Sequence, residues 1–123
     1  MKVLVTGASG QLGRETLLAL QAAGEDAIGI DRPELDFSQP DKVADGIRAH
    51  RADWVINCAA YTHVDKAEQE QDLVFRVNRD SAKAVAQGVS SYGGRLLHVS
   101  TDFIFGGEQS HPYAEGDPAN PLG

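Results

Sequence analysis

Three glycines near the start of the chain have the spacing of a phosphate-binding loop. The segment Thr6-Gly7-Ala8-Ser9-Gly10-Gln11-Leu12-Gly13 places glycines at every third position, directly after a short apolar stretch. In such a loop the backbone turns sharply and approaches a pyrophosphate with no Cβ in the way, so free N–H groups and a helix dipole meet the phosphates. An ordinary strand-to-helix turn is the alternative, but the position between a strand-like and a helix-like segment favours dinucleotide binding. The residues predicted to bind here are Gly7, Ser9, Gly10, Gln11, Leu12 and Gly13.

A carboxylate follows at the distance where a dinucleotide site needs one. Asp31 lies 18 residues after Gly13, at the end of the second apolar stretch. There it can accept hydrogen bonds from the hydroxyls of the adenosine ribose. Its charge would repel a 2′-phosphate and so favours NAD, whereas the adjacent Arg32 would pair with that phosphate and favour NADP. The sequence leaves this choice open, and it leaves a solvated turn carboxylate as the alternative for Asp31.

Two later segments end strand-like stretches in groups suited to a ligand site. In the segment from Val55 to Thr62 the apolar stretch runs into the small residues Cys58, Ala59 and Ala60, which leave room for a ligand above a sheet. The segment Leu97–Gly107 contains Ser100-Thr101-Asp102, two hydroxyls and a carboxylate at the end of a strand. A polar strand-to-loop turn is the alternative for the latter.

These segments together resemble the dTDP-4-dehydrorhamnose reductases, a group of extended short-chain dehydrogenases/reductases. The Gly-x-x-Gly-x-x-Gly spacing is typical of short-chain dehydrogenases, and NCAAYTHVDKAE (Asn57–Glu68) and LHVSTDFIFGG (Leu97–Gly107) are similar to segments of the reductases. The resemblance implies NADPH- or NADH-dependent reduction of the 4-keto group of a dTDP-4-dehydro-6-deoxy-L-sugar, in dTDP-L-rhamnose biosynthesis. It covers nearly the whole chain, but only the first half or less of a family member.

The resemblance implies a catalytic role for one residue, Thr101. Its hydroxyl would hydrogen-bond the substrate carbonyl oxygen and help to polarise it, while Ser100 and Asp102 would support the loop. Phe103 stands where the family often has a tyrosine, so a hydrogen bond from that phenol to the sugar is absent here.

Further cofactor and substrate contacts are implied by the same resemblance. Asp36 has a helix-preceding cap as its alternative role, Tyr61 a core aromatic, and Asn78 an exposed polar residue on a helix. The implied cofactor contacts in this group are Asp36, Phe37, Ala59, Ala60, Tyr61, Asn78 and Ser100, and the implied substrate contacts are Val64, Asp65, Asp102 and Phe103.

In the resembling reductases the last loop of this chain leads into a Tyr-x-x-x-Lys motif that donates the proton. The residues four positions after Tyr61, Tyr92 and Tyr113 are aspartate, leucine and aspartate, so no such pair lies within the 123 residues. We therefore expect residues 1–123 to form an NAD(P)-binding Rossmann domain that stops before the catalytic helix and the sugar-binding part, with negligible turnover alone. The alternative function is a non-catalytic nucleotide-binding or regulatory module of the same family.

Hydrophobic periodicity predicts the elements that position these residues. Short apolar stretches alternate with helix-like ones, which is typical of right-handed βαβ units. We expect an α/β partial Rossmann fold, with a parallel sheet of about four strands in the order 3-2-1-4 and helices on both faces. The predicted strands are Lys2–Thr6, Ala27–Ile30, Trp54–Asn57 and Arg95–Ser100.

Composition narrows the classes of function and partner. The net charge is −7, from 11 basic and 18 acidic residues without a basic cluster, which argues against nucleic acid binding. No apolar run approaches membrane-spanning length, and the lone Cys58 fits a reducing compartment, so we expect a cytoplasmic protein without membrane contact. None of the four histidines has a ligand partner at metal-site spacing. The expected partners are the dinucleotide, a sugar nucleotide and, because an open sheet edge exposes backbone groups, other copies of the chain.

Overall fold

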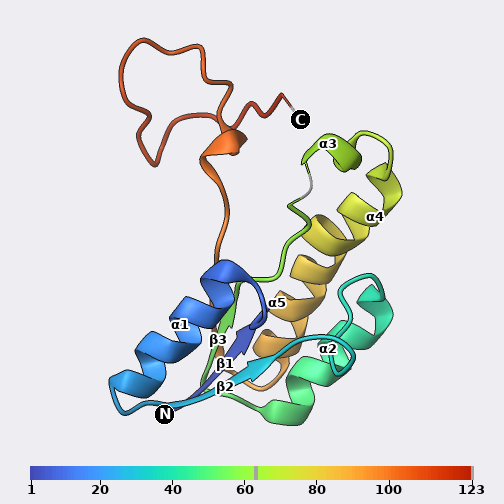
Figure 1. Cartoon of the computed structure of the whole chain (residues 1–123), viewed down its shortest axis with the longest axis vertical. Helices are drawn as coiled ribbons and strands as arrows, with labels where there is room; N and C mark the ends of the chain where they lie inside the picture. The colour runs from blue at the N-terminus through green and yellow to red at the C-terminus, as the bar shows by residue number, and fades with distance from the viewer. Residues whose placement is uncertain (63, 123) are drawn as a thin grey trace.

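The computed structural model describes residues 1–62 and 64–122, apart from the side chains of Val64 and Asp65 (Figure 1). Strands and helices alternate through residue 98, as the periodicity predicts. The elements in chain order are β1 (Lys2–Thr6), α1 (Gln11–Ala22), β2 (Asp26–Ile30), α2 (Pro40–His50), β3 (Trp54–Asn57), α3 (Val64–Ala67), α4 (Gln71–Phe75), the π-helical turn η1 (Arg76–Asp80), α5 (Ser81–Ser91), β4 (Arg95–His98) and the 3₁₀ turn η2 (Asp102–Ile104).

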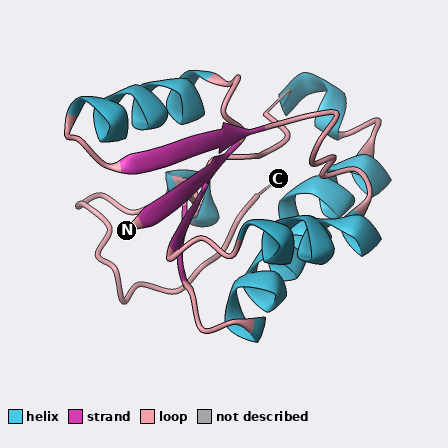
Figure 2. Cartoon of the chain, turned by 90° about the horizontal axis from the view of Figure 1, so that it is seen from below, coloured by secondary structure: helices cyan, strands magenta, loops and turns pink. Residues whose placement is uncertain are grey.

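The four described strands form one parallel sheet in the order β2-β1-β3-β4. The α/β class and the parallel sheet are confirmed, and the expected order 3-2-1-4 is wrong. Helix α1 packs against β1 and β2, whereas α2 packs on α5, and the two helical layers cover opposite sides of the sheet (Figure 2). Because βαβ crossovers are right-handed, a helix on the face opposite to α1 adds the next strand on the opposite side of the sheet. Helix α2 therefore returns the chain past β1, and β3 pairs with β1 instead of β2.

The main apolar core lies between the sheet and the layer formed by α2 and α5. Val43 and Ile47 of α2 and Val85 of α5 are each fully buried against Leu4 and Val55 of the sheet. The helical spacing of valines along α5 thus faces the sheet, as its periodicity indicates. Burial of this apolar surface is the main term that stabilises the fold.

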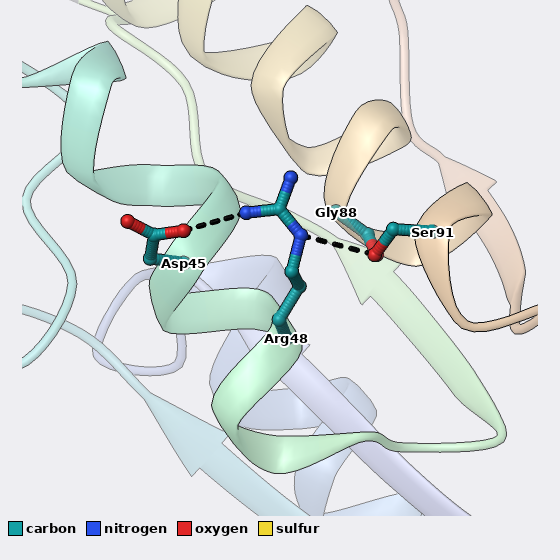
Figure 3. Close-up of polar contacts among 4 residues, drawn as sticks. All are labelled: Asp45, Arg48, Gly88 and Ser91. Atoms are coloured by element: carbon teal, nitrogen blue, oxygen red, sulfur yellow. Dashed lines mark hydrogen bonds and ion pairs between the residues drawn. The ribbon is translucent and has the colours of Figure 1, made fainter.

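Helices α2 and α5 approach closely at Gly88. A Cβ at this position would lie 2.9 Å from the carbonyl oxygen of Ala44, so only glycine permits the approach. Beside it, Arg48 Nε donates to Ser91 Oγ at 3.0 Å and Nη1 pairs with Asp45 at 2.6 Å, while Ser91 Oγ donates to the Gly88 carbonyl at 2.6 Å (Figure 3). Exposed ion pairs stabilise little, so the close approach at Gly88 matters more to the packing of these two helices than the Arg48–Asp45 pair does.

Strand β4 ends at His98, two residues before the predicted Ser100. Its partner β3 ends at Asn57, which pairs with His98, and the Val99 N–H makes the last bond between the two segments, to the Asn57 carbonyl at 3.2 Å. Residues 99–122 then leave the sheet and form a separate lobe (Figure 1). This lobe is held internally by the stacked rings of Phe105 and Tyr113, whose centroids lie 4.5 Å apart. Within the described residues, no helix has the length and apolar character to cross a membrane.

Candidate cofactor-binding site

A cavity of about 360 Å³ opens at the carboxyl ends of β1, β2 and β3. In the order β2-β1-β3-β4 the connections leave β1 and β3 toward opposite faces of the sheet, which makes this the topological switch point where α/β sheets bind ligands. Ten of the predicted cofactor residues line the cavity: Gly7, Ser9, Gly10, Asp31, Arg32, Asp36, Phe37, Ala59, Ala60 and Tyr61.

The three loop glycines have different physical roles. Gly7 has a φ of +64°, and a Cβ there would lie 2.8 Å from the Ala59 backbone. A Cβ on Gly13 would lie 2.0 Å from the Gly7 carbonyl oxygen, so this glycine lets α1 cross close to β1. Gly10 has an ordinary φ of −76°, and its Cβ would meet only the Gly7 oxygen, at 3.3 Å. Gly10 lines the cavity, so its missing side chain leaves room for a ligand.

The N-terminus of α1 is available to an anion. The helix begins at Gln11, and no side chain caps it within the described residues. The amides of the first turn of an α-helix have no partner within the helix, and the dipole makes this end positive. Arg14 is the first residue whose N–H donates back along the helix, to Gly10 at 3.0 Å. The side chains of Gln11 and Leu12 do not line the cavity, so their predicted contribution reduces to these backbone groups.

Asp31 is held as a carboxylate on the rim of the cavity. Its Oδ2 accepts the Ser9 N–H at 3.0 Å and also the Ser9 hydroxyl, and its Oδ1 accepts the Arg32 N–H at 2.9 Å. Partial burial opposes ionisation, but these hydrogen bonds and the Arg32 charge outweigh it and hold the pKa of Asp31 below its ordinary value. The carboxylate is therefore charged at neutral pH and fixed to the glycine loop.

Asp36 and Phe37 form the wall of the cavity before α2. Asp36 Oδ1 accepts from the Ser38 N–H at 2.9 Å and the Ser38 hydroxyl at 2.8 Å, and these bonds lower the pKa of Asp36. The side chain thus stabilises the turn before α2, close to the capping role that the sequence left as an alternative. Phe37 is buried and belongs to the core, and it also lines the cavity.

Asn78 holds the backbone of Tyr61, a residue that lines the cavity. Its Oδ1 accepts the Tyr61 N–H at 2.8 Å, and its Nδ2 donates to the Tyr61 carbonyl at 3.3 Å. The Tyr61 hydroxyl donates to the Glu70 carboxylate, which is the main cause that raises the pKa of Tyr61 to about 12. Asn78 lies in the π-helical turn η1, and such turns often occur at functional sites. Glu70 was not identified from the sequence, where only its position on a polar surface is visible.

A row of polar side chains joins the strand ends below the cavity. Thr6 Oγ1 donates to Asn57 Oδ1 at 2.6 Å, and Asn57 Nδ2 lies 3.1 Å from His98 Nδ1. The three residues are register partners on β1, β3 and β4. Each lies one or two residues before a segment that the sequence predicted to bind ligand. Sequence reasoning missed this row; the signal was polar residues at the ends of otherwise apolar strands.

Comparison with known proteins decides the family. Residues 1–123 match the family described as the RmlD substrate binding domain. The chain belongs to this family. The chain is 41% identical over 118 residues to a dTDP-4-dehydrorhamnose reductase of Streptomyces griseus, which covers 96% of the chain and 39% of that protein. It is 38% identical over 122 residues to a probable dTDP-4,6-dihydroxy-2-methyloxan-3-one 4-ketoreductase of Streptomyces antibioticus, covering 98% of the chain and 41% of that protein.

Solved structures of this RmlD family have the same fold as the chain. A dTDP-4-dehydrorhamnose reductase of Clostridium acetobutylicum superimposes with a TM-score of 0.91 at 39% identity, over 98% of this chain and 43% of that one. The dTDP-4-dehydrorhamnose reductase of Bacillus anthracis, solved in complex with NADP, superimposes with a TM-score of 0.89 at 35% identity, over 98% of this chain and 43% of that one. The chain spans about two fifths of the length of the relatives that it matches.

The predicted catalytic segment of this RmlD-family chain lies outside the cavity. Thr101 Oγ1 accepts the Phe103 N–H at 3.2 Å and lies 3.4 Å from Asp102 Oδ1, so it caps the turn η2. Ser100, Asp102 and Phe103 are exposed, with Phe103 75% accessible. The structure therefore separates this segment from the residues that line the cavity.

Two predicted substrate contacts cannot be placed in the site. Val64 and Asp65 are in helix α3, but their side chains lie outside the described residues, so their roles stay predictions. Among the residues that the structure describes, no group of three or more His, Cys, Asp and Glu side chains is placed to hold a metal ion.

Proposed function

We propose that this chain binds NADPH or NADH in the cavity at the carboxyl ends of β1, β2 and β3, as the cofactor-binding part of a dTDP-4-dehydrorhamnose reductase. The observation that carries the proposal is the meeting of Gly10, Asp31 and Ala59 around one cavity at the switch point of the sheet. Family membership and the similarity to reductases support the same conclusion.

The residues present fit the two ends of the adenosine diphosphate part of such a cofactor. Gly10 supplies a surface without a side chain, and the uncapped N-terminus of α1 supplies amides and positive potential for a pyrophosphate. Asp31 supplies a charged acceptor for ribose hydroxyls, held in place by Ser9. The bound nicotinamide would supply the hydride for the reduction.

The structure supports both cofactor forms through different side chains. Asp31 disfavours a 2′-phosphate, whereas the exposed Arg32 beside it is free of ion pairs within the described residues and suits that phosphate. The Bacillus anthracis relative was solved with NADP, which favours the phosphorylated form. We expect NADPH to bind at least as tightly as NADH, and Arg32→Ala to weaken NADPH selectively.

For the reaction itself we propose the 4-keto group of a dTDP-4-dehydro-6-deoxy-L-sugar as the target, with Thr101 as hydrogen-bond donor to that oxygen. The chain alone should bind cofactor with negligible turnover. Thr101 lies outside the cavity, and no tyrosine of the 123 residues has a lysine four positions later. Loss of a general acid typically slows such a step by about 10²–10⁴-fold.

The test is a titration of the purified chain with NADPH and with NADH, followed by nicotinamide fluorescence and calorimetry. Saturable binding is expected, at least about tenfold weaker for both cofactors in Gly10→Val and for NADH in Asp31→Ala, because the carboxylate accepts hydrogen bonds from ribose hydroxyls. Gly116→Val and Asp26→Ala are matched controls, because Gly116 has open space around its Cα and Asp26 is exposed at the far end of β2. Absence of binding at millimolar cofactor, or equal losses in test and control variants, would overturn the proposal.

A second candidate is a non-catalytic nucleotide-binding or regulatory module, favoured by the position of Thr101 outside the cavity, where its side chain bonds within its own turn. It predicts cofactor binding together with a stable protein partner whose capture does not depend on a sugar nucleotide. Capture that requires the sugar nucleotide would contradict it.

A further inference from the structure

A second cavity, of about 630 Å³, lies at the end of the sheet opposite the cofactor site. It is bounded by the residues where β3 and β4 begin, Trp54 and Arg95, and by the segments that lead into these strands. Because the strands are parallel, their amino ends lie together at this edge, a strand length away from Gly10. Its volume lies within the range of about 300–1,000 Å³ of small-molecule sites.

Two arginines in this cavity stack on aromatic rings in place of pairing with acids. The Arg51 Cζ lies 5.4 Å from the ring centroid of Tyr92, and the Arg95 Cζ lies 5.7 Å from that of Trp54. Neither guanidinium forms an ion pair within the described part of the chain. The chain carries a net charge of −7, so two unpaired cations at one cavity run against its overall charge. Stacked guanidinium groups keep their N–H edges free for an anion.

Two further features distinguish the Tyr92 corner of the cavity. The Tyr92 hydroxyl is shielded from solvent and has no hydrogen-bond partner within the described residues. Buried hydroxyl groups are nearly always paired, and burial raises the pKa of this phenol, so it keeps its proton as a donor. Arg51 itself has a φ of +44°, the left-handed conformation that is unfavourable for a residue other than glycine.

The side chains that line the cavity carry more donors than acceptors. Asp53 is the carboxylate of the cavity, and its Oδ2 already accepts the backbone N–H of Lys2 at 2.8 Å. The two guanidinium groups carry only donors, and the Tyr92 hydroxyl has a proton to donate. A ligand that complements this set must bring several negatively charged oxygens.

We propose that the cavity between Arg51, Tyr92 and Arg95 is a binding site for a small oxyanion that carries a phosphate group or several carboxylates. The anion is held between the two guanidinium groups, and its binding opens the Tyr92 corner, so that one of its oxygens accepts the proton of the hydroxyl that is shielded without ligand. This site is separate from the cofactor cavity and does not depend on the proposed reductase function.

The chain offers an internal probe for this site. Trp54 is the only tryptophan and lines the cavity, so its fluorescence reports binding there. The 123-residue chain is titrated with inorganic phosphate and with citrate, against potassium chloride at matched ionic strength. A saturable change with phosphate alone identifies phosphate compounds as the ligand class, and one with citrate alone identifies polycarboxylates. No change beyond that of chloride would overturn the proposal.

Three variants separate the site from general electrostatics. Arg51→Gln and Arg95→Gln should each weaken binding about tenfold or more, because a hydrogen bond between charged groups is lost. Arg76→Gln removes the same charge from η1, outside the cavity, and should bind like the wild type. Equal affinity of all three would refute the site.

The variant Tyr92→Phe tests the unpaired hydroxyl. Without ligand its thermal midpoint should equal or exceed that of the wild type, because an unpaired buried group has been removed. With saturating phosphate or citrate it should gain less stability than the wild type. A lower midpoint without ligand would show that the hydroxyl is already satisfied. Gly10→Val should keep the Trp54 response in full, so failure at either cavity is distinguishable from failure at the other.

Discussion

Substitutions at two glycines of the loop, three residues apart, should affect different properties: one the stability of the fold and the other cofactor binding. Gly13→Ala places a Cβ 2.0 Å from the Gly7 carbonyl oxygen, about 1.4 Å inside the 3.4 Å at which ordinary contact begins. That oxygen belongs to the backbone and cannot rotate away. Gly10→Ala places its Cβ 3.3 Å from the same oxygen, which a shift of about a tenth of an ångström relieves.

The expected losses in the free energy of unfolding differ accordingly. Overpacking in a rigid interior typically costs about 1–3 kcal/mol, and the overlap at Gly13 should reach or exceed the upper end. Gly10 is the N-cap of α1 with an ordinary φ, and alanine is a poorer N-cap by about 1 kcal/mol. Cofactor affinity should follow the opposite pattern among folded variants, because Gly10 lines the cavity and a side chain there takes up space for the ligand. We expect Gly10→Ala to weaken NADPH binding about tenfold or more.

Urea unfolding followed by Trp54 fluorescence measures the first quantity, and NADPH titration of the folded protein measures the second. With a slope of about 1–3 kcal/mol per molar urea, a loss of about 3 kcal/mol lowers the midpoint by about 1–3 M. Gly116→Ala is the matched control, because nothing lies within 4 Å of its added Cβ. The reasoning is refuted if Gly13→Ala unfolds at the wild-type midpoint, or if Gly10→Ala is destabilised as much as Gly13→Ala.

Two titrations test the electrostatics of the cavity. Because the folded-state pKa of Asp31 lies below its unfolded value, Asp31 stabilises the fold above the unfolded pKa of about 3.9, and this contribution is lost as pH falls through the lowered value. Asp31→Asn should therefore lose less stability than the wild type when urea midpoints are compared between about pH 5 and pH 2; parallel curves would contradict this. Glu70→Gln should bring the pKa of Tyr61 down from about 12 toward its ordinary value of 10, measured by tyrosinate absorbance. An unchanged alkaline titration would show that Glu70 is not the cause.

Local features of this fold were predictable because short-range chemistry decides them. Trp54–Asn57 is a strand in both the prediction and the structure, because a short, mostly apolar run between polar segments is typical of a strand in a parallel sheet. The glycine spacing predicted a sharp turn from strand to helix, and the positive φ of Gly7 together with the Cβ distances at Gly7 and Gly13 shows that this turn requires glycine. The position of Asp31 at the end of β2 followed from the same local pattern.

The strand order was not predictable from the same information. Periodicity shows that Val43 and Ile47 of α2 face a core, but not which face of the sheet that core covers. Because βαβ crossovers are right-handed, the face that a helix covers determines on which side of the sheet the next strand is added. Without knowing the face covered by α2, the position of β3 cannot be predicted. The contact at Gly88 is part of the answer, because it lets α2 and α5 share one face. A helical period of 3.6 residues also gives no sign of the π-helical turn that brings Asn78 to Tyr61.

The cavity and the predicted catalytic segment differ in how far the chain itself prepares them. On the cavity side, Ser9 holds Asp31, Asn78 holds the Tyr61 backbone, and each contact joins segments far apart in the sequence. Such contacts fix the geometry before a ligand arrives, which lowers the entropy lost on binding. The side chain of Thr101, in contrast, bonds within its own turn and to no other segment that the structure describes. Cofactor affinity should therefore depend on contacts already present in these residues, whereas any catalytic use of Thr101 requires groups that bring its segment to the cavity.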